Sequence, residues 1–277
     1  MKDHRQLGKQ LDLFSFHPES PGNVFWHPKG WIIYEELKNF IRKKLVNYQE
    51  VSTPIMVKDN LFEQSGHLKH YKENMFNVRV DDQDYFLKPM NCPESTLIYK
   101  SKIRSYHDLP LRLSEFGILH RNELSGVLGG LFRLRQFTID DAHIYITKDQ
   151  IMEEVTNILK TMKDIYREFN FEPMFHLATR PTKCMGTEDQ WIEAELNLDM
   201  ALQNNLGSNY GVKEGDGAFY GPKIDIHIKD SQDRDWQLAT IQLDFQIPDR
   251  MELEYIDKDG KAKRPIIIHQ AILGSME

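Results

Sequence analysis

The sequence predicts an α+β fold with a mainly antiparallel β-sheet flanked by helices. Short β-like runs separated by hairpin-like loops fill residues 76–146 and 218–273, whereas helical periodicity is confined to a few separate blocks. Strands and helices segregated in this way are typical of an antiparallel sheet with helices packed against it. The 277 residues fit one large domain, or at most two small ones, and contain no internal repeats or low-complexity tracts.

Helices are expected where apolar residues recur at spacings of three and four. The second expected helix shows this pattern through Ile33, Leu37 and Ile41. Thr147 is the expected N-cap of the third helix, and Gln150 completes a capping box. In chain order, we expect an entry helix or arm over Asp3–Phe16 and helices over about Trp31–Tyr48, Thr147–Asn170 and Glu188–Asn204.

Strands are expected where β-favouring residues run between turn signals. The first expected strand carries Pro54, which lacks a backbone N–H donor and therefore belongs at an edge, a bulge or an interface. The turn Asp257–Gly260 joins a short run over Met251–Ile256 to the last strand. The expected strands are Gln49–Val57, Tyr85–Lys88, Leu111–Ile118, Phe132–Phe137, Ala142–Ile146, Ala218–Ile228, Trp236–Phe245 and Pro265–Leu273.

The composition excludes several classes of protein. With 40% apolar and 28% charged residues, intrinsic disorder is excluded as the main state. The apolar runs are far shorter than the roughly 20 residues that span a bilayer, so no membrane partner is expected. Two cysteines and the absence of a visible secretory signal favour the reducing cytoplasm. The net charge of −7 argues against a small basic nucleic-acid module, but a large enzyme can gather Lys and Arg on one face.

A glycine-bearing loop over Arg121–Leu131 carries the strongest charge pattern in the chain. Arg121 and Glu123 lie at its start, and Arg133 and Arg135 follow it. Arginines that face one cleft from adjacent strands suit a polyphosphate, because they form bidentate charged hydrogen bonds. A solvated hairpin with cross-strand charge pairs is the alternative, and the spacing alone favours it.

Three residues far apart in the sequence, Cys92, His143 and His269, are candidate metal ligands. A Cys-His-His set with an open fourth position is chemically suited to zinc, but their spacing gives no support, and a lone histidine is usually a packed or surface residue. Asp140 and Asp141 lie nearby in the sequence. The glycine-rich run Gly215–Lys223 matches neither a Walker loop nor a dinucleotide fingerprint, and is interpreted as a strand entry beside a ligand.

Taken together, several segments closely resemble the catalytic core of threonyl-tRNA synthetases, which are class II aminoacyl-tRNA synthetases, and the resemblance runs almost end to end. The resemblance implies one catalytic domain over residues 1–277, with a six- to seven-stranded antiparallel sheet. It places motif 1, which builds the dimer interface, at about residues 31–57, motif 2 at about 112–137, and the start of motif 3 at about 265–277. The most specific strings are Lys88–Pro93 (KPMNCP), Phe116–Gly126 (FGILHRNELSG), Asp140–Ile144 (DDAHI), Ala218–Ile224 (AFYGPKI), Gln242–Phe245 (QLDF) and Ile268–Glu277.

The resemblance also implies one zinc ion per subunit, held by Cys92, His143 and His269. Valine is nearly isosteric with threonine, and a plain pocket separates such isosteres only about a hundredfold. A zinc ion that binds the amino group and β-hydroxyl of the substrate would reject valine. The resemblance further implies that Asp141 accepts from this hydroxyl and that Tyr220 lines the site. The other implied substrate-binding residues are Met90, Lys223 and Gln242.

For ATP, the resemblance implies a catalytic Arg121 that bridges the threonine carboxylate and the α-phosphate. It implies that Arg133, also catalytic, holds the γ-phosphate end, with Mg²⁺ shared among the phosphates. Catalysis of adenylate formation would then rest mainly on positioning and electrostatics. The remaining implied roles are adenine recognition by Glu123, stacking by Phe137, the nucleotide-pocket lining by Gln237 and Thr240, and proton transfer near the terminal ribose of the tRNA by His67.

The expected function is therefore that of a cytoplasmic, homodimeric threonine–tRNA ligase, with ATP, L-threonine and tRNA(Thr) as substrates. No editing or anticodon-binding domain is recognised, and the resemblance stops within motif 3, so the chain is expected to be a fragment that activates threonine poorly alone. A non-catalytic amino-acid-binding paralogue is the first alternative, although it would not need the phosphate-binding arginines. A ligase for serine or for a carrier other than tRNA is the second. Departures from the usual pattern occur at Glu94, Ser95, Gln136, Ile139 and Gln270.

Overall fold

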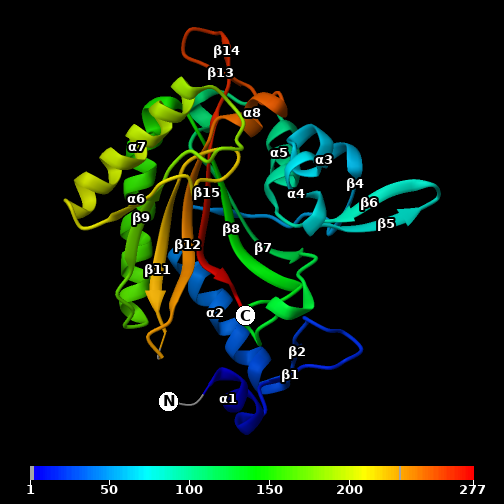
Figure 1. Ribbon diagram of the computed structural model, residues 1–277. Coiled ribbons are helices and arrows are strands. Elements are labelled where there is room, and N and C mark those ends of the chain that lie inside the picture. Colours follow the sequence, from blue (N-terminus) through cyan, green and yellow to red (C-terminus); the bar gives the residue numbers. More distant parts are fainter. Residues whose placement is uncertain (1–2, 231) are drawn as a thin grey trace.

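The structure, a computed structural model that describes residues 3–230 and 232–277, is built on an eight-stranded sheet (Figure 1). Six strands pair antiparallel, and a short parallel strand borders them at each edge. The predicted class is confirmed, and the two edge strands raise the count above the expected six to seven. The order across the sheet is β10 (Gly211–Lys213), β9 (Met174–Ala178), β11 (Lys223–Lys229), β12 (Asp235–Asp244), β15 (Ile266–Ser275), β8 (Gln136–Ile146), β7 (Leu111–His120) and β3 (Gln49–Glu50).

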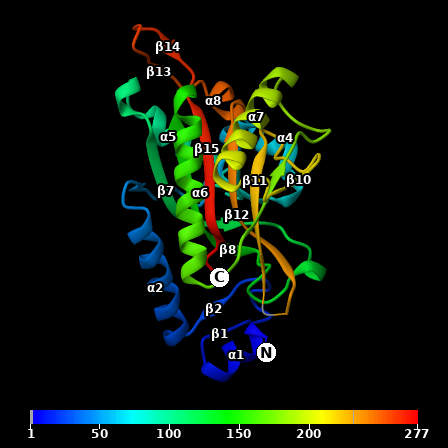
Figure 2. The same cartoon turned by 90° about the vertical axis from the view of Figure 1, so that its left-hand side faces the viewer.

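Helices α6 (Ile151–Glu168) and α7 (Glu188–Leu206) pack across one face of this sheet, and α2 (Pro28–Lys44) joins them at its edge (Figure 2). Side chains alternate between the two faces of a strand. Ile266 and Ile268 of β15 are therefore buried in the core beneath these helices. The residues between them and beyond, such as His269, point to the opposite face, which is where the candidate site lies.

The opposite face is covered at one end by several short elements (Figure 1). A three-stranded sheet lies there, together with the short helices and a second apolar cluster. Its elements are β4 (Met56–Lys58), β5 (Phe76–Val80), β6 (Gln83–Leu87), α3 (Asp59–Ser65), α4 (His67–Tyr71), α5 (Cys92–Lys100) and α8 (Gln246–Arg250). The peripheral elements are α1 (His4–Leu11), β1 (Phe14–Ser15), β2 (Phe25–Trp26), β13 (Tyr255–Ile256) and β14 (Ala262–Lys263).

The ladder between β15 and β8 breaks near the end of β15. Pairing is regular up to Ala271 and resumes only at Ser275. The buried carboxylate of Asp140 accepts the N–H groups of Ile272 at 3.1 Å and Leu273 at 2.8 Å, which gives hydrogen-bond partners to two amides in the break. The strand therefore departs from regular pairing here, while the N–H groups of these two residues remain hydrogen-bonded.

Most of the long elements agree with the prediction, with boundaries shifted by a few residues. The predicted capping box of Thr147 and Gln150 is confirmed, and it opens a 3₁₀ turn that leads into α6. Residues 132–135 are not a strand, because they belong to the loop, and the two strands predicted on either side of residue 140 are one continuous β8.

Three further strand predictions are wrong in part. Pro54 lies between two short strands, β3 and β4, rather than within a single strand over Gln49–Val57. Residues 218–222 form a turn, so β11 begins only at Lys223. Residues 251–256 alternate between buried and exposed as a strand would, but only β13 pairs, and its partner is β14. Helices α3, α4 and α5 and strand β9 were not predicted. In the part of the chain that the structure describes, no helix is long and apolar enough to cross a membrane.

Candidate active site

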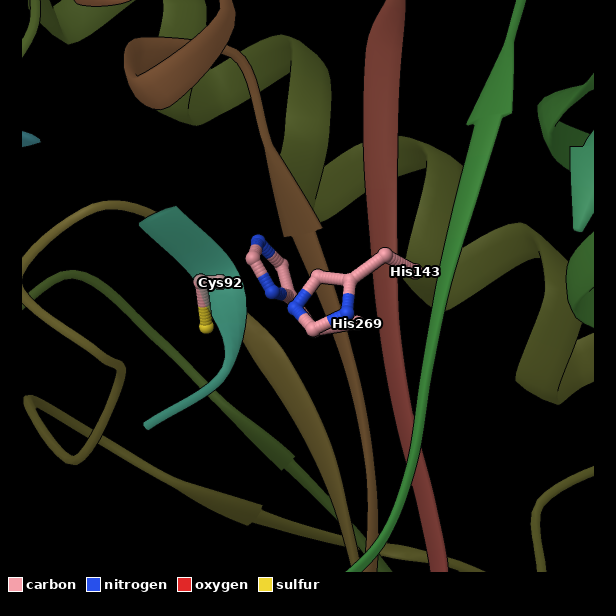
Figure 3. A group of neighbouring side chains, drawn as sticks. All are labelled: Cys92, His143 and His269. Atoms are coloured by element: carbon pink, nitrogen blue, oxygen red, sulfur yellow. The ribbon is translucent and has the colours of Figure 1, made fainter. Parts of the chain in front are cut away.

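The pairing of β8 with β15 brings two of the predicted metal ligands together. His143 and His269 are direct cross-strand partners, and their rings are 4.9 Å apart and nearly perpendicular. Cys92, the first residue of α5, completes the group (Figure 3). One ligand atom from each of the three buried side chains lies within 4.8 Å of the other two. The sheet topology thus brings together three residues whose spacing in the sequence gave no indication that they are neighbours.

The hydrogen bonds of this group fit a metal. Nε2 of His269 lies 2.9 Å from a carboxylate oxygen of the fully buried Asp244, which places the proton on that nitrogen. Nδ1 of His269 and Nε2 of His143 are buried without a hydrogen-bond partner. Burial lowers the pKa of His143 to about 4, so this imidazole is neutral and has a lone pair to offer. A histidine oriented by a carboxylate is the usual outer-shell arrangement around zinc.

The thiol of Cys92 completes the donor set that zinc prefers. Burial, together with the carboxylates of Asp141 and Asp244, raises the pKa of this thiol well above its ordinary value. A bound cation would reverse that effect, because a coordinating thiol is deprotonated outright. The three side chains therefore fit a zinc ion with an open fourth position.

Asp141 and Tyr220 lie beside the metal-ligand group. The carboxylate of Asp141 accepts from Nδ2 of Asn91 at 3.1 Å. The ring of Tyr220 is 5.0 Å from that of His269, and its hydroxyl donates to the side-chain oxygen of Gln242. Both predicted residues are buried, and each is held by a hydrogen bond to a neighbouring side chain.

The other predicted substrate-binding residues form a connected row. Gln242 pairs across the ladder with His269 on one side and with Lys223 on the other, and its Nε2 donates to Thr240 at 3.2 Å. The ammonium of Lys223 bonds to Asp225 at 2.7 Å. Met90 packs against the apolar cluster that holds Cys92 and Tyr220.

Asp225 was not predicted, although it organises this row. Its fully buried carboxylate accepts from Lys223 on one oxygen and from Nε2 of Gln237, at 2.6 Å, on the other. In the sequence it alternates with isoleucines, which is also the pattern of a solvent-facing residue on an ordinary strand. Its burial is set by the sheet, so no local signal could have identified it.

A cavity of about 220 Å³, referred to below as the second cavity because none of the three metal ligands lines it, adjoins the loop between β7 and β8. Phe137 forms part of its wall, and the guanidinium of Arg121 lies 5.0 Å from the centre of this ring. Arg133 donates to Glu123 at 3.0 Å. A charge pair of the kind expected for a solvated hairpin is therefore present, and both of its residues line the cavity. Thr240 does not line this cavity. The lining residues are Arg121, Glu123, Leu131, Phe132, Arg133, Leu134, Phe137, Ile139, Gln237, Gly274 and Ser275.

His67 begins α4 and is completely buried. Its Nδ1 lies 2.9 Å from the hydroxyl of Ser65, whereas its Nε2 has no hydrogen-bond partner. Burial lowers the pKa of His67 to about 3, so the imidazole is neutral. Its ring packs edge-on against Phe219, the neighbour of Tyr220, at 5.9 Å. His67 therefore lies behind the predicted amino-acid pocket rather than on an open surface.

Lys88 and Glu115 form a buried ion pair that was not predicted. The two groups are 3.0 Å apart, and their side chains are 1% and 6% exposed. Thr53 completes the group, because its N–H and hydroxyl donate to Glu115 and its hydroxyl accepts from Lys88. Lys88 begins the string that leads to Cys92, and Glu115 is on β7. The pair thus fixes the entry to α5 against the central sheet.

The departures from the usual pattern are distributed over the site. Ile139 lines the second cavity, whereas Gln270 accepts from the hydroxyl of Tyr48 at 2.8 Å. Gln136 bonds to His120 at 3.1 Å and does not line that cavity.

Glu94 and Ser95 are both buried in the first turn of α5. The hydroxyl of Ser95 bonds to that of Tyr145 at 2.8 Å. Both carboxyl oxygens of Glu94 lack a hydrogen-bond partner, and burial raises the pKa of this group to about 8. Glu94 is therefore neutral at pH 7.

Glu94→Gln is expected to remove a pH dependence of stability. In the unfolded chain Glu94 ionises near pH 4.5, whereas the folded chain holds it neutral up to about pH 8. Between these values ionisation favours the unfolded state, so the stability of the unaltered chain falls relative to that of E94Q as the pH rises. The expected difference grows by about 1.4 kcal/mol per pH unit.

Urea unfolding of both chains at several values between pH 5.5 and 7.5 measures this difference. Glu172→Gln, which alters an exposed glutamate, is the matched control and should follow the unaltered chain. Parallel pH profiles for E94Q and the unaltered chain would contradict the assignment of a neutral Glu94.

Comparisons with known proteins match the whole chain. A threonine–tRNA ligase of Clostridium botulinum (strain Langeland) is 54% identical over 278 residues, which cover 100% of this chain and 44% of that protein. A threonine–tRNA ligase of Caldanaerobacter subterraneus subsp. tengcongensis is 52% identical over 278 residues, which cover 100% of this chain and 43% of that protein. This chain thus spans less than half the length of these curated relatives.

Solved structures agree with this result. The RNA-binding domain of threonyl-tRNA synthetase from Cryptosporidium parvum has a TM-score of 0.96 and 47% identity, with 99% of this chain and 70% of that chain covered. A prolyl-tRNA synthetase from Giardia lamblia, in complex with prolyl-adenylate, shares only the fold, at a TM-score of 0.77 and 16% identity over 98% of this chain and 50% of that one. A family model described as the tRNA synthetase class II core domain (G, H, P, S and T) matches residues 75–277. The chain therefore belongs to the class II tRNA synthetase core family, among its threonyl-tRNA synthetase members.

Proposed function

We propose that this chain is the catalytic core of a threonine–tRNA ligase. The enzyme would activate L-threonine with ATP to threonyl-adenylate and pyrophosphate, and then transfer threonine to the 3′ end of tRNA(Thr). The observation that carries this proposal is the buried Cys92–His143–His269 group with two unpartnered ring nitrogens. Strands β8 and β15 carry His143 and His269 and also contribute Phe137, Ile139 and Ser275 to the arginine-lined cavity, which supports neighbouring sites for the amino acid and the nucleotide.

Selection of threonine is assigned to the residues around the metal ligands. A zinc ion held by Cys92, His143 and His269 would bind the amino group and the β-hydroxyl of threonine. Asp141 then accepts a hydrogen bond from this hydroxyl, and Tyr220 closes the pocket beside His269. Because Asp141 is buried, an amino acid without the hydroxyl would leave a desolvated acceptor unpaired, which disfavours valine. Met90, Lys223 and Gln242 complete the proposed pocket.

Activation is assigned to the arginine-lined cavity. Glu123 faces the adenine, Phe137 stacks on it, and Gln237 contacts the nucleotide. Thr240 acts from outside the cavity, through its hydrogen bond with Gln242. Arg133 holds the γ-phosphate end, with Mg²⁺ shared among the phosphates. Arg121 bridges the substrates: a carboxylate oxygen of threonine attacks the α-phosphorus, the bond to the β-phosphate breaks, and pyrophosphate leaves. The guanidinium offsets the charge that develops in this step.

Transfer to tRNA is assigned to His67. A ribose hydroxyl at the tRNA 3′ end attacks the carbonyl carbon of the adenylate, and AMP leaves. The proton of that hydroxyl needs an acceptor, and Nε2 of His67 is a neutral, unpartnered nitrogen behind the amino-acid pocket. Support for this assignment therefore comes from the position and the free lone pair of Nε2, whereas the lowered pKa of His67 makes the buried imidazole a weak base until the tRNA end binds.

We further propose that residues 1–277 act as one domain and form a homodimer in the cytoplasm through motif 1. The first turns of α2 support this interface, because they expose three large apolar side chains in succession. Trp31, Ile32 and Ile33 are 48%, 63% and 57% exposed. Contiguous apolar surface of this kind marks an interaction site.

The decisive experiment is calorimetric binding of threonine, valine and serine, with and without zinc. This measurement does not depend on ATP. We expect one zinc ion per chain, threonine binding only in its presence, and no detectable valine binding. Cys92→Ser should lose both zinc and threonine, whereas Cys184→Ser, which alters the other free cysteine, should keep both.

Each other outcome has a clear meaning. Equal binding of threonine and valine by the zinc-loaded chain would contradict the proposed substrate. Preferred binding of serine would point to the serine ligase. Zinc-dependent threonine binding without any ATP binding would favour the non-catalytic amino-acid-binding paralogue.

A further inference from the structure

The N-terminal helix α1 touches the loop that carries Arg133. Nε2 of His4 accepts a hydrogen bond from the backbone N–H of Leu131 at 3.1 Å. The same imidazole packs edge-on against the ring of Phe132, with 4.6 Å between the ring centres. Leu131 and Phe132 both line the second cavity, directly before Arg133. One histidine from a separate element thus contacts the wall of the proposed nucleotide pocket.

Gly130 shows how closely this contact is fitted. Its φ is +59°, a conformation that glycine adopts without strain. A Cβ added to Gly130 would lie 2.2 Å from Nε2 of His4, which is far inside van der Waals contact. The imidazole therefore occupies the space that a side chain at position 130 would need.

The other side of Phe132 is held as well. Trp236 of β12 stacks on this ring, with 4.3 Å between centres and 8° between planes. The guanidinium of Arg234 lies 5.4 Å from the ring of Phe132 and 5.5 Å from that of Trp236. Phe132 is thereby fixed between an imidazole on its edge and an indole on its face.

A second anchor lies on the far side of Arg133. The N–H of Arg135 donates to the carbonyl oxygen of Gly22 at 2.7 Å, and its guanidinium donates to that of Pro21 at 3.3 Å. The same guanidinium donates to the carbonyl oxygen of Glu123 at 3.0 Å. Residues near the N-terminus therefore bind the loop on both sides of Arg133: His4 before it, and Pro21 and Gly22 after it.

The tip of the loop makes hydrogen bonds within the loop, such as that from the N–H of Gly129 to the carbonyl oxygen of Arg133 at 3.2 Å, but two of its glycines lie in open space. A Cβ placed on Gly126 or Gly129 would meet no atom within 4 Å. Ordering such a segment at the moment of binding costs conformational entropy, and prior anchoring removes that cost.

We propose that His4 is a positioning residue for the nucleotide. It holds Leu131 and Phe132 so that Arg133 and its partner Glu123 stand at the cavity before ATP arrives. This inference rests on the proposed function, because it takes the ligand of the second cavity to be ATP. It assigns a role in ATP binding to a helix that lines no part of that cavity.

The test combines hydrogen exchange at the Leu131 amide with calorimetric binding of MgATP and of threonine with zinc. In His4→Ala we expect Leu131 to exchange at least tenfold faster and MgATP to bind five- to twentyfold more weakly, with threonine affinity unchanged. His4→Gln restores an acceptor for the Leu131 N–H and should recover part of the affinity. Lys9→Ala, at an exposed position of the same helix, is the matched control.

Gly130→Ala is the second variant, in case His4→Ala does not fold. It leaves the sequence of α1 unaltered, but its methyl group meets the imidazole and an alanine also strains the loop at this positive φ. It should therefore speed exchange at Leu131 and weaken MgATP binding at least as much as His4→Ala. The proposal is overturned if MgATP affinity stays within twofold of the unaltered chain while the Leu131 amide is released. It is also overturned if exchange at Leu131 does not change. An unaltered chain that binds no MgATP would overturn the proposed function, whereas the exchange data would still decide whether His4 orders the loop.

Discussion

Lys88→Met is expected to lower the free energy of unfolding by about 3–5 kcal/mol, because it leaves the buried carboxylate of Glu115 without its counter-charge. The hydrogen bonds from Thr53 remain, but they do not replace a full positive charge at 3.0 Å. Breaking one partner of a buried pair costs more than removing both, since no uncompensated charge is then left. Urea unfolding of the variant and of the unaltered chain measures the difference.

Two further variants make this result specific. The double variant K88M/E115Q should be more stable than K88M alone, because it removes the stranded charge and keeps an acceptor for Thr53. Lys229→Ala breaks an exposed pair with Asp233 and should cost less than about 1 kcal/mol. A double variant as unstable as K88M would show that lost packing, rather than charge, causes the effect.

Arg121→Ala is expected to slow threonine-dependent exchange of pyrophosphate into ATP by about 10²–10³-fold, the usual effect of removing one preorganised charge-stabilising donor. Arg121 lies between the ring of Phe137 and Pro89, whose carbonyl oxygen accepts from its Nε at 3.3 Å. These contacts hold the guanidinium in place at the edge of the cavity. Rates of exchange for the variant relative to the unaltered chain give the measurement.

The variant Arg121→Lys should recover only a small part of the rate, because an ammonium cannot bridge two anions in the bidentate way. Arg79→Ala, on the exposed β5–β6 hairpin, is the control and should leave the rate unchanged. Weaker threonine binding in R121A is expected as well, because Arg121 is proposed to contact the threonine carboxylate. An exchange rate within threefold of that of the unaltered chain would contradict the assignment.

The long elements of the fold were predictable because each buries one face. In α6 the apolar side chains recur at helical spacing, and all of those on one face are buried: Ile151, Val155, Ile158, Leu159, Met162 and Ile165. Strands β7, β11, β12 and β15 are long enough for apolar β-runs to reveal them. Short elements such as α3 and α4 were missed, because one or two turns carry no measurable period. Their formation depends on packing against β4–β6 and α8.

The site could be predicted only in part from the residues themselves. Cys92, His143 and His269 become neighbours because β15 returns antiparallel beside β8 and α5 begins next to them. No spacing encodes that encounter, so the resemblance to a known family supplied it. Buried charges such as Lys88 and Asp225 were missed for a related reason. A charged residue looks the same in the sequence whether it faces water or a buried partner.

Strand β15 has a consequence for any attempt to redesign this protein. One of its residues, His269, belongs to the metal-ligand group, while Ser275 lines the proposed nucleotide cavity. The number of residues between His269 and Ser275 therefore sets the distance between the two proposed pockets. A deletion or insertion between these two residues would exchange the faces of the strand beyond it and change the distance between the two pockets. Changes in amino-acid choice are therefore best made by side-chain substitution on α5 or β12, where the spacing to ATP is left intact.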